Sequence, residues 1–269
     1  MANTVYSNKV IEAKAKDILS TKINARSMMT IDDSLVGTAG MIKTINTYTY
    51  TGTAEELAAG AGNTVRGSIA YVGKDYTVKM VQQAFDYLDE DFMKDNVIVD
   101  MGIQGATSVM SNKMTSDFYG ALATTGSGST ELVQGLTFPK GKEIGYDVIV
   151  DAISALNVED ESGIFIIIPN AWKAALRKDA DYKAARMGEV VYNGQVGTIA
   201  GIPVVATKAL TNKAYVLTKE AVTLFLKKDV EVEQDRDADT RKNSIYLRDC
   251  YVCALTDATK ACKITQAAS

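Results

Sequence analysis

Residues 194–210 read GQVGTIAGIPVVATKAL, and the glycines at their start have the composition of a phosphate-binding loop. Such a loop needs converging backbone N–H groups and a helix that begins directly behind them. Nucleotide-binding loops have the spacing G-x-G-x-x-G, or G-x-x-x-x-G-K followed by Ser or Thr. Here the spacing is Gly194-x-x-Gly197-x-x-x-Gly201, and the strand-like run Ile-Pro-Val-Val follows. We therefore expect tight turns between short strands, with Pro203 tolerated near a strand start, and no nucleotide site.

The histidine and cysteine content limits catalysis and metal binding. The sequence contains no histidine, so the commonest general base and metal ligand are absent. Cys250 and Cys253 have the C-x-x-C spacing of a zinc or redox motif, but they lie in the strand-like run SIYLRDCYVCALT, where residues three apart point to opposite faces. Cys262 makes the cysteine count odd, in a chain without an export signal. We interpret all three as buried, reduced thiols and expect no cofactor and no metal.

Three acidic runs remain as candidates for metal ligands or an acid–base pair: DYLDED (86–91), EDE (159–161) and DRDAD (235–239). None has the alternating acidic positions, central glycine and closing glutamate of a calcium-binding loop. We interpret them as solvated charge at helix starts and turns, and we expect no catalytic residue and no enzyme. The less favoured alternative is a histidine-free α/β enzyme that acts through carboxylates such as Asp235 or Asp237.

The composition is that of an ordinary globular chain, with 46% hydrophobic and 23% charged residues among 269. No stretch approaches the roughly 20 uninterrupted apolar residues of a membrane-spanning helix, and the N-terminus lacks a secretion signal. We expect no membrane association and a cytoplasmic origin. The net charge of −4 argues against a dedicated nucleic-acid binder, although residues 1–30 carry a local basic excess that we interpret as a solvated helix face.

The N-terminal part is predicted to form a helix and a hairpin. Residues 6–25 place apolar side chains at helical spacing, which indicates an amphipathic helix. Residues 41–52 and 67–80 are rich in Thr, Tyr, Ile and Val and predict two long strands of an extended hairpin. The hairpin is polar on both faces, so we expect it to lie on another molecule.

From residue 83 to residue 122 the apolar period is near 3.6, which predicts the longest helix of the chain. Its apolar positions are Phe92, Val97, Ile98, Met101, Val109, Met110, Met114 and Phe118. We interpret them as core positions. Gly102 and Gly105 weaken the helix by roughly 1 kcal/mol each relative to alanine, which indicates a close packing contact or a bend.

After residue 140 the pattern becomes α/β. A helix with Tyr146, Ile149 and Ile153 on one face precedes the buried strand GIFIIIP, and a second helix carries Trp172 and Leu176. A polar surface loop covers 177–194. The remaining strands are KAYVLT, VTLFLKKDVEVEQDRD, NSIYLRDCYVCALT and ACKIT, and the second is expected to pair with the third across the turn ADTRK. The long helix and the C-terminal strands are expected to share a core.

Three stretches together resemble a known family: GQVGTIAGIPVVATKAL, VLTKEAVTLFLKKDVEVEQDRD and SIYLRDCYVCALTDATKACKIT. A glycine turn with Gly-Ile-Pro-Val, then Lys-Glu-Ala, a Val-Glu strand that ends in Arg-Asp and a terminal apolar strand are common in major capsid proteins of tailed bacteriophages. The order of the N-terminal helix, hairpin and long helix is similar as well. The resemblance implies an α+β chain with the Hong Kong 97-type phage capsid fold.

The resemblance implies a division of the chain into an N-terminal arm, an extended β-hairpin loop, a spine helix with the first part of a peripheral domain, an axial domain and the C-terminal peripheral strands. The expected ranges are 1–37, 38–82, 83–140, 141–219 and 220–269, in that order. It also makes exposed residues of the hairpin and one strand end candidate contacts between subunits. These candidates are Tyr48, Tyr50, Tyr71, Lys74 and Arg236.

The implied function is that of a structural capsid protein that self-assembles, as pentamers and hexamers, into an icosahedral shell around double-stranded phage DNA. A portal, and a scaffolding protein encoded separately, are implied partners, and the DNA inside is held without sequence-specific binding. The expected location is the virion capsid, after assembly in the host cytoplasm. The alternative with the same fold is an encapsulin-like bacterial nanocompartment that stores an enzyme.

Overall fold

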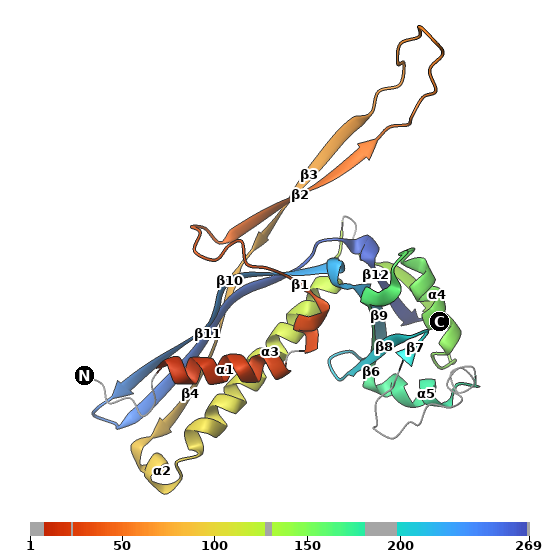
Figure 1. Ribbon diagram of the computed structural model, residues 1–269. Coiled ribbons are helices and arrows are strands. Elements are labelled where there is room, and N and C mark those ends of the chain that lie inside the picture. Colours follow the sequence, from red (N-terminus) through yellow and green to blue (C-terminus); the bar gives the residue numbers. More distant parts are fainter. Residues whose placement is uncertain (1–7, 23, 127–130, 181–197, 268–269) are drawn as a thin grey trace.

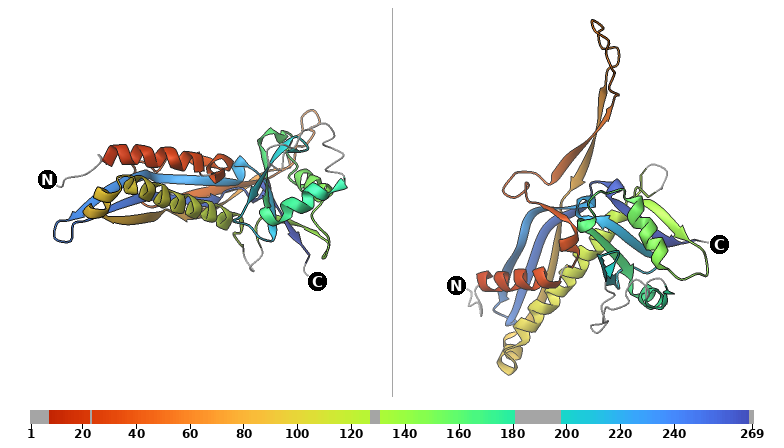
Figure 2. Two further views of the ribbon diagram at one scale, coloured as in Figure 1. Left: turned by 90° about the horizontal axis from the view of Figure 1, so that it is seen from below. Right: turned by 45° about the vertical axis from the view of Figure 1, so that its right-hand side comes forward.

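The computed structural model describes residues 8–22, 24–126, 131–180 and 198–267 and has three parts (Figure 1). An elongated body contains the longest strands, a compact unit with a second sheet lies at one end of it, and a two-stranded hairpin projects from the body. In the right-hand view of Figure 2 the outer half of the hairpin has no other element beside it. In the described part of the chain, no helix is long and apolar enough to cross a membrane.

The sheet of the body has the strand order β1-β10-β11-β4. Its longest strands, β10 (Val222–Asp237) and β11 (Lys242–Leu255), are antiparallel and are joined across the predicted turn. β4 (Lys79–Leu88) pairs antiparallel with β11, and β1 (Thr30–Asp32) pairs parallel with β10. The expected pairing of the two long C-terminal strands is therefore confirmed.

Helices α1 (Asn8–Lys22) and α3 (Ile98–Leu122) cover one face of this sheet, and the short helix η1 (Asn24–Met28) follows α1 (Figure 1). The buried positions of α3 recur every three or four residues, as a packed helix face requires. They include Val99, Ile103, Ala106, Met110, Met114 and Phe118. This face, the inner face of β10 and β11 and part of α1 form the largest apolar cluster, so the predicted sharing of a core is confirmed.

The predicted long helix begins too early in the sequence. Residues 83–88 belong to β4, a short helix α2 (Asp89–Lys94) follows, and α3 starts only at Ile98. Residues 84–88 alternate with the period of two that is typical of a strand. Phe85 packs against the main core and Tyr87 is buried in it, whereas Ala84, Asp86 and Leu88 are exposed. The close contact expected at Gly102 is present, because a Cβ there would lie 2.3 Å from the Phe85 ring.

The hairpin consists of β2 (Ile42–Thr51) and β3 (Ser68–Thr77), which pair antiparallel over their whole length. This confirms the predicted extended hairpin. The connection between the strands, residues 52–67, is exposed apart from the half-buried Val65. Inside it, Glu55 accepts hydrogen bonds from the backbone N–H and hydroxyl of Thr64 at 2.9 and 2.6 Å.

The compact unit has a six-stranded sheet of order β5-β12-β9-β6-β8-β7. Its strands are β5 (Gln134–Phe138), β6 (Ile164–Pro169), β7 (Thr198–Ile199), β8 (Ile202–Thr207), β9 (Lys213–Thr218) and β12 (Ala261–Gln266). Its helices are α4 (Tyr146–Ala155) and α5 (Lys173–Lys178), with 3-10 turns at Glu161–Gly163, Asn170–Trp172, Lys219–Ala221 and Ala258–Lys260. Pro169 is the last residue of β6 and caps the 3-10 turn Asn170–Trp172 that follows.

Both faces of the compact sheet are buried, which explains the uninterrupted apolar run of β6. Ile164, Ile166 and Ile168 pack in the cluster that contains α4 and α5, whereas Ile167 packs in the core of the body. Strand β12 lies between β5 and β9, so residues 261–266 belong to the compact sheet although the range 220–269 was expected to stay together. The division into named capsid domains stays a prediction.

The glycine-rich segment forms a hairpin turn. β7 and β8 are antiparallel and are joined by Ala200 and Gly201, which have φ angles of 50° and 81°. Two consecutive residues with positive φ are typical of a type I′ turn, and glycine suits the second position because it has no Cβ. Gly201 therefore shapes a turn, as predicted, and Pro203 is accepted in β8. Gly194, Gly197 and most of the expected loop 177–194 lie outside the described residues.

Candidate assembly interface

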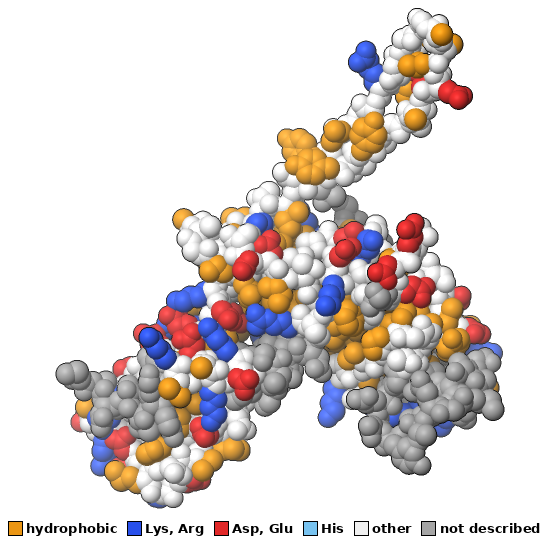
Figure 3. Space-filling view, in the orientation of Figure 1, with side chains coloured by type: hydrophobic (Ala, Val, Ile, Leu, Met, Phe, Trp, Pro, Cys, Tyr) orange, Lys and Arg blue, Asp and Glu red, His pale blue; other side chains and the backbone are white. Residues whose placement is uncertain are grey.

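One face of the hairpin is aromatic and uncovered. Residues that pair directly across an antiparallel ladder point to the same face. Tyr48 pairs with Tyr71, and Tyr50 pairs with Ile69. Their exposed fractions are 66%, 69%, 68% and 68%, in that order, and hydrophobic side chains are visible along the hairpin in Figure 3. Four large side chains on one face of a projecting ribbon form a surface that a partner can cover; we call them the aromatic face.

Contacts within the hairpin orient the aromatic face. The rings of Tyr48 and Tyr71 are tilted against one another with centroids 6.2 Å apart. The ring of Tyr50 lies across the backbone of the two glycines that flank the tip, because a Cβ at Gly52 or Gly67 would lie 2.7 or 2.1 Å from its hydroxyl oxygen. Glycine at both positions therefore provides the space in which this tyrosine lies flat.

The base of the hairpin is fixed to the body. The Tyr76 hydroxyl donates a hydrogen bond to the backbone carbonyl of Leu255 at 2.8 Å, and its ring stacks on Phe225 with centroids 6.0 Å apart. Burial raises the pKa of Tyr76, so the hydroxyl keeps its proton and stays a donor. Lys43 donates to the Ser34 hydroxyl at 2.6 Å. The aromatic face is thus held out on a ribbon with an anchored root.

Lys74 does not belong to the aromatic face. It pairs with Ile45 on the opposite face of the ribbon, where its ammonium lies 5.2 Å from the centre of the Tyr76 ring. The five candidate contacts are therefore not one cluster. The three tyrosines lie together, and Lys74 is exposed on the other side of the same ribbon.

Arg236 is engaged within the chain. Its guanidinium lies 2.6 Å from Asp89, which also accepts a hydrogen bond from the Asn243 amide at 2.6 Å. The hydrogen bond from Arg236 is the main reason why the pKa of Asp89 is lowered. A similar contact joins Lys242 to Asp86 at 2.7 Å. The acidic run 86–91 thus ties β4 and α2 to the far end of β10 and β11, where the prediction had only solvated charge.

A second exposed apolar surface lies on α2 and α3. Met93 is in α2, Val97 is the residue before α3 and Met101 is in the first turn of α3, and their side chains are 82%, 49% and 60% exposed. The sequence interpretation put Val97, Met101 and Val109 in the core, but the helix presents a different face to the sheet. The available signal was the number of apolar positions: Met101 and Val109 add to the buried set of α3, and one helix cannot bury its whole circumference against a single sheet.

The structure shows no grouping of residues for catalysis in its described part. Cys250 packs beside Phe225 on one side of β11 and Cys253 packs against the main core on the other, so the predicted opposite orientation is confirmed. Burial raises the pKa of Cys253 to about 12, which keeps this thiol protonated and unreactive. Among the described residues, no group of three or more His, Cys, Asp or Glu side chains is placed to hold a metal ion.

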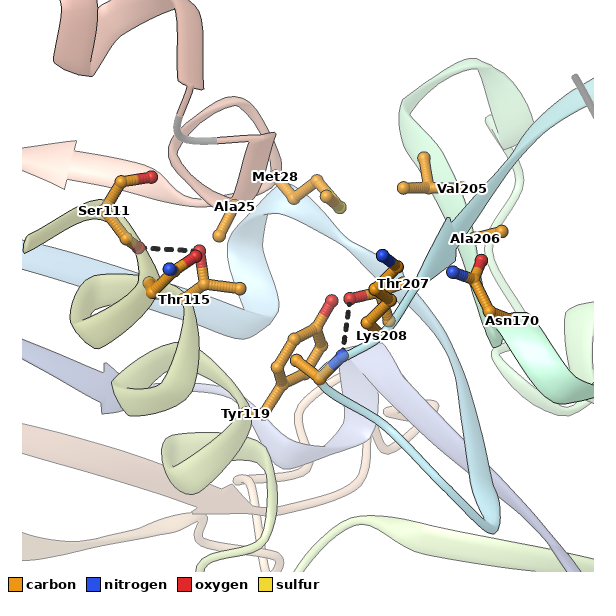
Figure 4. Close-up of a pocket in the computed structure, with 12 residues that line it drawn as sticks. Ala25, Met28, Ser111, Thr115, Tyr119, Asn170, Val205, Ala206, Thr207 and Lys208 are labelled. Atoms are coloured by element: carbon orange, nitrogen blue, oxygen red, sulfur yellow. Dashed lines mark hydrogen bonds between the residues drawn. The ribbon is translucent and has the colours of Figure 1, made fainter. Parts of the chain in front are cut away.

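The cavity beside α3 is also unlike an active site. A cavity of about 620 Å³ lies between α3, η1 and the end of β8 (Figure 4). Its polar groups are Ser111, Asn112, Thr115, Tyr119, Asn170, Thr207 and Lys208. Several of these hydroxyls serve local structure; Thr115, for example, donates to the carbonyl of Ser111 at 2.9 Å. The described lining therefore combines hydroxyls and amides with one lysine and contains no carboxylate.

These features define a class of protein. A long two-layered body with a spine helix, a compact unit with a doubly covered sheet and an anchored, projecting hairpin are the parts of the Hong Kong 97-type capsid fold, which is α+β. No family model matches the sequence. A "Major capsid protein" of Staphylococcus phage phiMR11 is 26% identical over 260 residues, which cover 92% of this chain and 89% of the phage protein.

Solved structures agree with this class. The capsid of cyanophage P-SCSP1u matches with a TM-score of 0.69 at 13% identity and covers 91% of this chain and 88% of its own. A virus-like particle from Pyrococcus furiosus matches with a TM-score of 0.63 at 10% identity, and the match covers 95% of this chain and 98% of the chain of that particle. The chain has the Hong Kong 97-type fold, and its resemblance to the major capsid proteins of tailed bacteriophages is confirmed. It is a structural capsid shell protein.

Proposed function

We propose that copies of this chain assemble as pentamers and hexamers into a closed icosahedral shell that encloses double-stranded phage DNA. The observation that carries the proposal is the uncovered aromatic face on an anchored ribbon. Within one chain most of the surface of this face stays uncovered, because four large side chains remain about two-thirds exposed. Covering such residues by a second copy removes their apolar surface from water at roughly 25 cal/mol per Å².

The exposed side chains of Met93, Val97 and Met101, around the junction of α2 and α3, support the proposal because they are further apolar surface that another copy can cover. Two different exposed apolar surfaces on each copy are compatible with a head-to-tail contact, which closes into rings when the rotation between copies is suitable. Many such contacts per particle hold a shell together even where each is weak.

The charge of the chain bears on how enclosed DNA would be held. A chain of net charge −4 does not concentrate cations along a groove for DNA. Two of the basic side chains of α1 are engaged within the chain: Lys14 lies 2.7 Å from Asp100 and Lys16 lies 3.0 Å from Glu12. Such a surface encloses DNA without sequence-specific binding. The proposal includes a portal, a separate scaffolding protein, assembly in the host cytoplasm, and no enzymatic activity.

The expected domain ranges enter the proposal in modified form. We assign 1–37 to the N-terminal arm, 38–82 to the extended loop, 83–140 to the spine and peripheral domain and 141–219 to the axial domain. The range 220–269 supplies peripheral strands up to Leu255, and β12 returns to the compact sheet.

A nanocompartment shell is the second candidate, supported by the similarity to the particle from Pyrococcus furiosus. The experiment that separates the two candidates is expression of the full chain with the neighbouring genes, followed by electron microscopy and analysis of particle contents. Packaged DNA supports the phage head, and a single co-purifying enzyme supports the compartment.

The aromatic face is tested by the double variant Tyr48→Ala/Tyr71→Ala. We expect it to keep the circular dichroism spectrum of the wild type and to lose shells in electron microscopy. The matched control is Val72→Ala, because Val72 is next to Tyr71, equally exposed and on the opposite face. A double variant that still forms shells as efficiently as the control contradicts the assignment of this face.

A further inference from the structure

A buried carboxyl group lies beneath the N-terminal helix. Asp249 is in the middle of β11 with only 4% of its surface exposed. It accepts a hydrogen bond from the backbone N–H of Cys250, but its Oδ1 atom is buried and has no hydrogen-bond partner among the described residues. A charged carboxylate in such a place carries a large desolvation cost.

The strand opposite Asp249 is bulged. Lys228 pairs with Cys250 and Glu231 pairs with Arg248, so Asp229 and Val230 together stand against Asp249. A bulge of this kind bends the strand and redirects side chains. The Asp229 carboxylate accepts a hydrogen bond from the backbone N–H of Val230 at 3.0 Å and lies 3.7 Å from Lys16 of α1. The N-terminal helix is thus connected to the bulge.

Helices α1 and η1 cover this region of the sheet. Asp249 alternates with Leu247 and Tyr251, whose side chains belong to the main core. The same core contains Ile11 and Ala15 of α1 and Ala25 and Met28 of η1. Removal of α1 and η1 would bring water to this face of β11, where the carboxyl lies.

The charged groups around Asp249 come from all the elements packed there. Those elements carry Glu12, Lys14 and Lys16 on α1, Arg26 on η1, Lys228, Asp229 and Glu231 on β10, Asp100, Lys113 and Asp117 on α3, Lys79 on β4 and Arg248 on β11. Several neutralise one another, as Lys228 does with Glu231 at 2.7 Å. Asp229 opposes the ionisation of Asp249 and Arg26 favours it. Burial, and in addition the negative charge of Asp249, raises the pKa values of its neighbours Cys250, Tyr251 and Cys253.

Burial, and to a lesser extent the negative charge of Asp229, raise the pKa of Asp249 to about 7. Arg26 and the Cys250 N–H act in the other direction but do not compensate. The ordinary value of this carboxyl is 3.8, so the covered state binds the proton more tightly than a state in which water reaches it.

We propose that α1 and η1 form a proton-sensitive cover over Asp249, which stays seated while the carboxyl carries a proton and loosens when the proton is lost. The sign follows from linkage: the cover has its full stability below about pH 4, weakens as the pH rises toward 7, and weakens no further above it. The N-terminal segment is thereby the part of the subunit whose position responds to pH near neutrality.

The test is limited digestion of the unassembled full chain with trypsin, which cleaves after the basic residues of α1 and η1 only when they are uncovered. Lys9, Lys14, Lys16, Lys22 and Arg26 are the sites, and Arg66 in the exposed hairpin tip is the internal reference for protease activity. From the two pKa values, cleavage in 8–28 relative to Arg66 is expected to rise about thirtyfold from about pH 5.5 to about pH 8.

Asp249→Asn keeps the group neutral, so its cleavage ratio should stay low and independent of pH. The matched control Asp100→Asn removes the partner of Lys14 and should raise the ratio equally at every pH. If Asp249→Asn does not fold, Asp229→Asn removes the neighbouring negative charge and should move the transition to lower pH. A flat wild-type ratio, an Asp249→Asn variant that rises like the wild type, or an unmoved Asp229→Asn transition overturns the proposal. None of these outcomes depends on shell formation.

Discussion

Two glycines of the spine helix allow a matched test of how tightly α3 packs on β4. A Cβ at Gly102 would lie 2.3 Å from Cε2 of Phe85, whereas a Cβ at Gly105 would have no atom within 4 Å. Both residues are interior to α3, and neither has a positive φ. Alanine therefore brings the same gain in helix propensity at both positions, about 1 kcal/mol, and only Gly102→Ala adds a clash.

The size of the clash sets the expected difference. To restore the 3.4 Å of ordinary contact from 2.3 Å, the Phe85 ring must withdraw by 1.1 Å (3.4 − 2.3), in a region packed against the main core. Overpacking of this kind costs about 1 to 3 kcal/mol. We expect Gly105→Ala to stabilise the subunit by about 1 kcal/mol and Gly102→Ala to be about 1 to 3 kcal/mol less stable than Gly105→Ala.

The assay is urea unfolding of the unassembled chain, followed by tryptophan fluorescence and circular dichroism. Phe85→Leu, combined with Gly102→Ala, should recover part of the loss because a smaller side chain leaves room for the methyl group. If Gly102→Ala is as stable as Gly105→Ala, the contact between α3 and β4 is looser than described and the reasoning fails.

Two further predictions concern acid and the glycine turn. Hydrogen bonds from Lys242 and Arg236 lower the pKa values of Asp86 and Asp89, respectively. The contribution of these two carboxylates to stability is therefore present above their ordinary pKa of 3.8 and is lost as the pH falls below it. Urea midpoints of the wild type should drop in that pH range, and those of the double variant Arg236→Ala/Lys242→Ala should drop less. Gly201 has a φ of 81°, which a β-branched residue adopts only with strain, so Gly201→Val should lower the free energy of unfolding by about 1 to 2 kcal/mol. Gly201→Asn should lower it by less, because Asn tolerates a positive φ. Equal losses in the two variants would show that the turn does not keep this conformation.

Elements with one clear period were predictable from the sequence. The hairpin, β10, β11 and α4 each show regular alternation or a single helical stripe, and the structure has all of them. The start of α3 was not predictable, because the apolar residues Phe85 and Tyr87 of β4 fit the first turns of a helix as well as they fit a strand. Strands β1 and β5 carry little apolar signal of their own and exist through pairing with distant strands.

The candidate interface was predictable by residue type but not by geometry. Tyrosines at alternate positions of β2 indicate one face, and Tyr48 and Tyr50 do share it. Which residue of β3 faces them depends on the register, and this register puts Tyr71 on the same face and Lys74 on the other. The contact of Arg236 with Asp89 spans 147 positions and has no local signature.

The position of β12 has a consequence for when the subunit takes shape. In the compact sheet β12 separates β5 from the other four strands, and in the body β11 separates β4 from β10. Both sheets therefore stay open during synthesis until residues 242–266 have left the ribosome, whereas the hairpin needs only neighbouring segments to pair. During translation the hairpin with its aromatic face is therefore complete before the sheet of the body has formed. The order of synthesis thus delays assembly until the C-terminal strands are present.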